Sequence, residues 1–162
     1  METTQPLEVQ LGEVLKQRHW TVSSAESCTG GLVMHRLTNI PGSSDYVIGG
    51  IVCYSNQVKH EVLKVKQETL DAYGAVSEQT AREMVLGALA LFRTTFAVAI
   101  TGIAGPGGGT PTKPVGLTYI SAARAGDEPI VRRHVWNGDR EAVKTASAEE
   151  ALRMVLELAA KA

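Results

Sequence analysis

Three apolar runs of this chain each end in a short segment of hydroxyl-bearing residues and glycines. These segments are residues 27–31, 54–56 and 101–109. Glycine lets backbone N–H groups come close to a bound anion or amide, and a small polar residue that opens a helix leaves unpaired donors facing a ligand. This arrangement is typical of small α/β proteins, and it predicts a small-molecule pocket.

The bulk composition fits one domain and excludes several classes of protein. With 162 residues, 44% of them apolar, the chain is expected to form a single domain over residues 1–162. A formal charge of −1 argues against a protein that coats nucleic acid or an anionic membrane. No stretch approaches the roughly 18 apolar residues of a membrane span, and no signal peptide is expected. Two cysteines without C-x-x-C spacing predict a reducing, cytoplasmic setting.

Apolar periodicity predicts helices that alternate with strands, followed by a late pair of strands. Ser77 is expected to cap the helix that follows it, and the segment 137–139 is expected to cap the terminal helix. The Gly/Pro-rich segment up to Pro114 is too long for a hairpin turn and is read as a functional loop. The expected helices cover residues 7–15, 32–38, 57–63 (or an irregular turn there), 78–92 and 140–159, and the expected strands 20–24, 47–54, 96–101, 115–123 and 130–136.

This order of elements predicts an α/β fold: a single-domain three-layer sandwich with a mixed β-sheet and helices packed on its faces. The last two expected strands form an antiparallel hairpin. Ligands in such folds bind outside the carboxyl ends of the strands, which is where each of the three glycine-containing segments begins. We therefore expect the three segments to meet at one edge of the sheet.

Ser27 is a candidate nucleophile, but a serine hydroxyl is weak unless a base removes its proton. The G-x-S-x-G pattern does not surround it. A serine at a strand-to-helix turn is more often a helix cap or an anion contact, and Thr29 competes for the capping role. Both interpretations of Ser27 stay open on spacing alone.

Lys59 is the candidate base, because a lysine whose reference pKa of roughly 10.4 is lowered by burial serves this purpose in Ser-Lys enzymes. In this interpretation Tyr54 relays a proton or orients the lysine. The alternative is that Lys59 is an ordinary solvated surface residue. The spacing between Tyr54 and Lys59 does not choose between these readings.

Two further charged residues have open roles. Glu26 either pairs with a cation in the pocket or complements the dipole of the helix that follows it. Arg140, beside Gly138 and Asp139, either offers a bidentate fork to a phosphate or is an exposed first-turn arginine.

No cofactor is expected. The four histidines are scattered without H-E-x-x-H spacing, so no metal site is predicted. The glycine-rich loop matches neither the P-loop pattern nor the dinucleotide pattern G-x-G-x-x-G in a strand-to-helix setting, so neither ATP nor NAD is predicted.

Taken together and in order, six segments resemble the CinA C-terminal domain family over nearly the whole chain. Each is weak alone, but their order and spacing are specific. They are residues 25–31, 41–44, 54–56 with Lys59, 74–77, 101–106 with 113–116, and 138–140.

The resemblance implies a nicotinamide-nucleotide amidohydrolase, which converts nicotinamide mononucleotide (NMN) and water to nicotinate mononucleotide and ammonia. The family's catalytic serine, tyrosine and lysine match Ser27, Tyr54 and Lys59, and no matched position is substituted. Family members commonly form dimers, so a homodimer is expected. The residues expected to bind the substrate are Thr29, Gly30, Gly31, Thr101, Gly102, Gly105 and Arg140.

Two other functions compete with this one. A catalytically silent nucleotide-binding regulatory module would use the same pocket, although the intact Ser27, Tyr54 and Lys59 weigh against it. A DNA-associated accessory protein would need a basic stripe with interleaved aromatic residues, which the sequence lacks.

Overall fold

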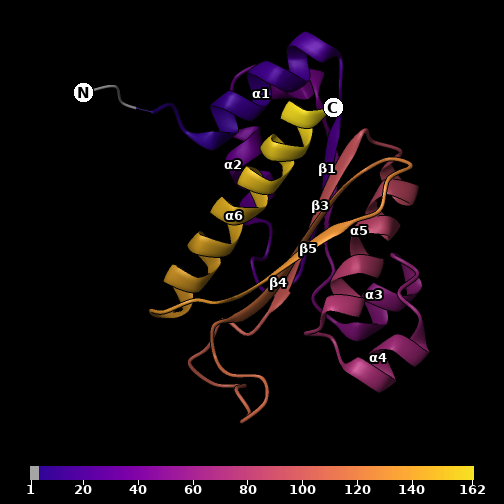
Figure 1. Cartoon of the computed structure of the whole chain (residues 1–162), viewed down its shortest axis with the longest axis vertical. Coiled ribbons are helices and arrows are strands. Elements are labelled where there is room, and N and C mark those ends of the chain that lie inside the picture. Colours follow the sequence, from indigo (N-terminus) through magenta and orange to yellow (C-terminus); the bar gives the residue numbers. More distant parts are fainter. Residues whose placement is uncertain (1–3) are drawn as a thin grey trace.

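Five strands form one mixed sheet in the computed structural model, which describes residues 4–162 (Figure 1). The spatial order is β2-β1-β3-β4-β5. Strand β1 pairs in parallel with β2 and with β3, whereas β4 pairs antiparallel with β3 and with β5. The predicted mixed sheet and late hairpin are confirmed; residues 1–3 of the predicted 1–162 domain lie outside the described residues. The strands are β1 (Val22–Glu26), β2 (Val47–Val52), β3 (Phe96–Gly102), β4 (Leu117–Arg124) and β5 (Ile130–Val135).

Helices cover both faces of this sheet, as the α/β prediction requires. Figure 1 shows α1, α2 and α6 on one side of the strands and α3, α4 and α5 on the other. The helices are α1 (Leu7–Arg18), α2 (Leu32–Thr38), α3 (Asn56–Glu61), α4 (Gln67–Tyr73), α5 (Glu78–Phe92) and α6 (Arg140–Lys161), with a short 3₁₀ helix at Ser43–Asp45.

The central strand β3 separates two apolar clusters by the alternation of its side chains. Phe96, Val98 and Ile100 join the cluster that also contains residues of α1, α2 and α6. Ala97 and Ala99 point the other way, into the cluster formed with α5. Small alanines on that face leave room for the side chains of α5 against the strand.

The predicted helix caps are confirmed. Ser77 Oγ accepts a hydrogen bond of 3.1 Å from Thr80 N at the start of α5. Asp139 accepts one of 2.9 Å from Ala142 N at the start of α6. These side chains satisfy donors that the first turn of a helix otherwise leaves without partners.

Two local predictions are wrong. The first strand runs over Val22–Glu26 and not over 20–24, because the Trp20 backbone N–H donates to Leu15 O at 2.9 Å in the turn that ends α1. Helix α4 was not predicted, because only Leu70 of its seven residues is buried and one apolar position gives no periodicity.

The parallel strands place the functional segments together. Because β1, β2 and β3 run in the same direction, their carboxyl ends meet at one edge of the sheet. The loop 103–116 extends beyond this edge, at the lower end of the molecule in Figure 1.

Candidate active site

Ser27 lies in the turn directly after β1, at the predicted edge of the sheet. Its backbone N–H donates to Ile100 O at 3.0 Å, so the adjacent strand β3 fixes the start of the turn. The chain then enters α2 through Gly31, whose φ of 104° lies in the left-handed region. Ser27 is 8% exposed and lines a cavity.

Lys59 approaches Ser27 from helix α3. Ser55 caps this helix by accepting from Val58 N at 3.1 Å, which fixes the first turn of α3. The Lys59 side chain is 1% exposed, and its Nζ lies 3.1 Å from Ser27 Oγ. Burial lowers the pKa of the Lys59 ammonium below its usual value. The alternative of a solvated surface lysine is therefore wrong.

The Lys59 amine has two other partners, both main-chain carbonyls. Nζ donates to Cys53 O at 2.9 Å and to Tyr54 O at 3.1 Å. The chain just after β2 thus holds the amine against the Ser27 hydroxyl.

Tyr54 contacts Lys59 through its backbone, while its side chain points elsewhere. The ring is 64% exposed, and its hydroxyl lies 3.4 Å from a guanidinium nitrogen of Arg140. Arg140 also donates to Gly105 O at 2.7 Å. The late arginine and the tyrosine therefore meet at the mouth of the Ser27 cavity, 86 residues apart in the chain.

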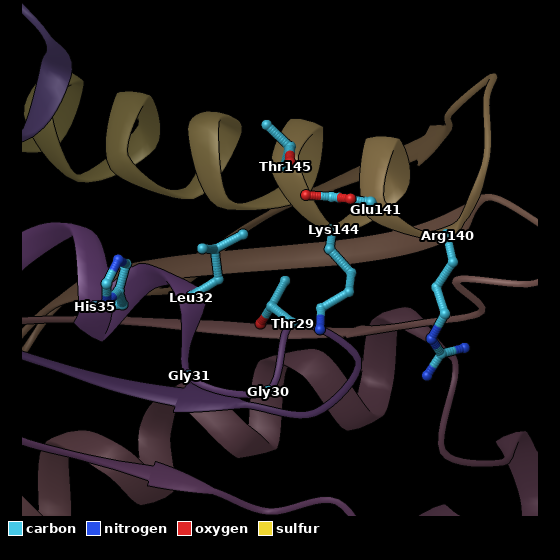
Figure 2. A pocket seen from close by; sticks show the side chains of 9 residues that line it. All are labelled: Thr29, Gly30, Gly31, Leu32, His35, Arg140, Glu141, Lys144 and Thr145. Atoms are coloured by element: carbon cyan, nitrogen blue, oxygen red, sulfur yellow. The ribbon is translucent and has the colours of Figure 1, made fainter.

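The residues that were expected to bind the substrate line two adjoining cavities. The cavity over Ser27 measures about 270 Å³ and is also lined by Lys59, Tyr54, Thr101, Gly102 and Gly105. The second measures about 550 Å³ and is lined in part by Thr29, Gly30 and Gly31 (Figure 2). Arg140 lines both cavities, so the expected residues surround two neighbouring cavities.

The Thr101 hydroxyl is engaged with the protein. Thr101 is 1% exposed, and its Oγ1 donates to Ala75 O at 2.7 Å. Ala75 and Val76, which precede α5, line the Ser27 cavity as well. Both residues belong to segment 74–77, which resembles the CinA C-terminal domain family, but they were not predicted to line the site because they are apolar and lie in a loop.

Glu26 complements the dipole of α2, which decides between its two predicted roles. Its carboxylate, 1% exposed, accepts from the backbone N–H groups of Val33 at 2.9 Å and Met34 at 3.2 Å, and from Thr29 Oγ1 at 2.8 Å. Within residues 4–162 no cation lies within ion-pair distance of it. Neither Ser27 nor Thr29 caps α2, so the capping interpretation of both hydroxyls is wrong.

Both cysteines are free and buried beside the site. Burial raises the pKa of the Cys28 thiol and of the Cys53 thiol to about 11 each, which makes them poor nucleophiles at neutral pH. The described part of the chain contains no group of three His, Cys, Asp or Glu side chains that could hold a metal ion. None of its helices is long and apolar enough to cross a membrane.

Known proteins with similar sequences include one that is named an amidohydrolase. The chain is 47% identical over 147 residues to the nicotinamide-nucleotide amidohydrolase PncC of Escherichia coli K12, a match that covers 91% of this chain and 89% of that protein. It is 48% identical over 159 residues to a CinA-like protein of Chloroherpeton thalassium, covering 96% of this chain. The chain spans 38% of the length of that second relative.

Solved structures share the fold. The competence/damage inducible protein CihA of Agrobacterium tumefaciens superimposes with a TM-score of 0.89 at 40% identity, covering 98% of this chain and 99% of that one. A CinA superfamily protein of Klebsiella pneumoniae gives a TM-score of 0.92 at 33% identity, covering 96% and 97%. The sequence model of the family described as "CinA C-terminal domain" matches residues 4–159. The chain therefore belongs to this family.

Proposed function

We propose that this protein is a nicotinamide-nucleotide amidohydrolase that hydrolyses the carboxamide of NMN to nicotinate mononucleotide and ammonia. One observation supports the chemistry above all: a buried lysine amine lies 3.1 Å from a serine hydroxyl in a cavity. The full-length similarity to PncC, named for this activity, supports the substrate.

Lys59 is the general base in this proposal. A neutral amine has two N–H bonds and one lone pair. The carbonyls of Cys53 and Tyr54 accept the two N–H groups, so the lone pair is left facing the Ser27 hydroxyl. Burial favours this neutral form because a desolvated ammonium is costly. The surrounding structure thus prepares Lys59 to receive a proton.

Ser27 is the nucleophile. Its oxygen attacks the carboxamide carbon while its proton passes to Lys59, which gives a tetrahedral intermediate. Collapse of the intermediate breaks the C–N bond, and Lys59 gives its proton to the departing nitrogen, which leaves as ammonia. A water molecule then attacks the nicotinoyl ester while Lys59 takes a proton from it. The ester C–O bond breaks, Lys59 returns the proton to Ser27 Oγ, and nicotinate mononucleotide leaves. No metal or organic cofactor enters these steps.

The glycine-containing loops supply the oxyanion donors. Within residues 4–162 the backbone N–H groups of Cys28 and Thr29 have no hydrogen-bond partner, and they directly follow Ser27. Donors next to the nucleophile stabilise the negative oxygen of the intermediate, and this is usually the largest single contribution in such sites.

The remaining residues position the substrate. Thr101, Gly102 and Gly105 form the wall of the Ser27 cavity, and Arg140 with Tyr54 borders its mouth. Thr29, Gly30 and Gly31 line the adjoining cavity, where the rest of the nucleotide fits. A homodimer and a cytoplasmic location remain predictions based on the family resemblance and on the two free thiols.

Ammonia release from NMN by the purified protein tests the proposal. We expect stoichiometric formation of nicotinate mononucleotide, with no ammonia from the Ser27→Ala variant. Saturable binding of NMN without turnover would contradict the proposal and identify a silent nucleotide-binding module.

A further inference from the structure

The 550 Å³ cavity beside the Ser27 site is lined by basic side chains from two helices. Arg140 and Lys144 come from the first two turns of α6, and His35 comes from α2 (Figure 2). Residues four apart lie on the same face of a helix, so Arg140 and Lys144 project side by side. Figure 2 shows the Lys144 side chain extending from α6 toward Thr29 and Gly30, while the Arg140 side chain extends from the start of the same helix.

Lys144 has no ion-pair or hydrogen-bond partner among residues 4–162. Its Nζ lies 3.7 Å from the position that a Cβ on Gly30 would occupy. The absence of a side chain on Gly30 and Gly31 leaves their backbone open to a ligand. An uncompensated ammonium over an open glycine loop is suited to an anion.

The acidic groups near the cavity do not cancel this charge. Glu141 lines the cavity but is exposed to solvent, so water screens it. Glu26 is buried beneath the loop, where the N–H groups of Val33 and Met34 bind its carboxylate. Arg140 and Lys144 therefore leave the cavity wall positive.

The second cavity adjoins the Ser27 cavity. Arg140 borders both cavities, and Cys28 lies between Ser27 and Thr29, which line one each. Burial raises the pKa of Cys28 to about 11, and the positive charges of Lys144 and Lys59 act on it in the opposite direction. Lys144 at one cavity and Lys59 at the other therefore both lie near Cys28.

We propose that this cavity is the subsite for the phosphate monoester of the substrate, and that Lys144 is the residue that selects a nucleotide over the corresponding nucleoside. This proposal rests on the proposed function: the carboxamide lies at Ser27 and the 5′-phosphate lies between Lys144, Arg140 and the backbone of Gly30. Arg140 already donates a hydrogen bond to Gly105 O, so Lys144 supplies the cation that is free to bind the phosphate.

The test compares kcat/KM for NMN and for nicotinamide riboside, which lacks the phosphate. The Lys144→Met variant keeps the length of the side chain and removes its charge. We expect kcat/KM for NMN to fall about 10- to 100-fold, mainly through KM, with a much smaller change for the riboside. Lys144→Arg should restore most of the preference. Lys161→Met, at the exposed end of the same helix, removes an equal charge and should behave as wild type.

A binding experiment keeps the subsite testable without turnover. We expect ribose 5-phosphate to bind the wild type in calorimetry, and Lys144→Met to weaken this binding at least 10-fold. Equal losses on NMN and riboside, or no loss on either, would overturn the proposal. So would binding of inorganic phosphate without ribose 5-phosphate, which would indicate a site for the free anion. If wild type releases no ammonia from NMN, the proposed function fails while this binding result still decides the subsite.

Discussion

Lys59 Nζ lies 3.1 Å from Ser27 Oγ, although 32 residues separate the two in the chain. Ser27 follows β1 and Lys59 lies on the short helix after β2, so the parallel pairing of these strands brings them together. The two main-chain carbonyls that bind the amine orient it toward the hydroxyl.

Ser27→Ala should abolish turnover and leave NMN binding in place, because the loss of one hydroxyl keeps the walls of the cavity. Rapid acid quench of the wild type during turnover should yield a nicotinoyl ester on the peptide that contains Ser27, if the ester forms faster than it is hydrolysed. Ser44→Ala, at an exposed serine, is the matched control. Substantial hydrolysis by Ser27→Ala would exclude the covalent route and favour water activated by Lys59.

Lys59→Ala should lower kcat about 10²- to 10⁴-fold, as expected for a general base, with a smaller effect on NMN binding. Lys66→Ala, at an exposed lysine, should have no effect on kcat. Near-normal turnover of the Lys59 variant would show that the lysine is structural.

The rate of hydrolysis should rise with pH as Lys59 loses its proton. Only the neutral amine accepts the Ser27 proton, and burial lowers the pKa of Lys59, so the neutral fraction grows at lower pH than for a free lysine. A profile of kcat/KM against pH should therefore show an apparent pKa below the ordinary value of about 10.4. Lys59→Arg should stay inactive across the profile, because a guanidinium does not deprotonate in this range. An apparent pKa at or above the ordinary lysine value would contradict the claim that burial lowers the pKa of Lys59.

Tyr54→Phe should lower kcat less than Lys59→Ala does. The variant loses the hydroxyl near Arg140 but keeps the backbone carbonyl that binds Lys59. Steady-state ammonia release measures the difference, with Tyr73→Phe, at another exposed tyrosine, as the control. A loss as large as that of Lys59→Ala would place the Tyr54 hydroxyl in the proton transfer itself.

Chelation should leave the rate unchanged. The proposed steps need no metal, and the described residues offer no cluster of metal ligands. Turnover measured before and after incubation with EDTA checks this. Loss of activity that zinc or magnesium restores would refute the Ser27 and Lys59 mechanism as written.

Glu26→Gln should lower the free energy of unfolding by about 1–3 kcal/mol, because an amide replaces a buried carboxylate that accepts two backbone N–H groups. Urea denaturation monitored by circular dichroism measures the change. Glu78→Gln, at an exposed position in the first turn of α5, should cost much less. Equal costs for the two variants would show that Glu26 does not hold the start of α2.

The order of the elements, the sheet edge and two helix caps could be predicted from the sequence. Apolar periodicity located the strands, and Ser77 and Asp139 cap their helices through local bonds that depend on neighbouring residues only. The role of Ser27, Tyr54 and Lys59 as a set came from the resemblance to a family, since their spacing alone also fitted a solvated surface lysine. The short helix α4 escaped prediction because its single buried residue, Leu70, gives no pattern.

The sequence by itself therefore determined most of the secondary structure and the sheet edge where the three glycine-containing segments meet, because these depend on local periodicity and on glycine and hydroxyl residues at strand ends. Only the tertiary structure decided the burial of Lys59, the meeting of Arg140 with Tyr54, and the position of Lys144 over Gly30. Each of these contacts depends on how α3 and α6 pack on the sheet. The packing energy is the sum of many small contacts between residues far apart in the chain, so it cannot be predicted from a short stretch of sequence.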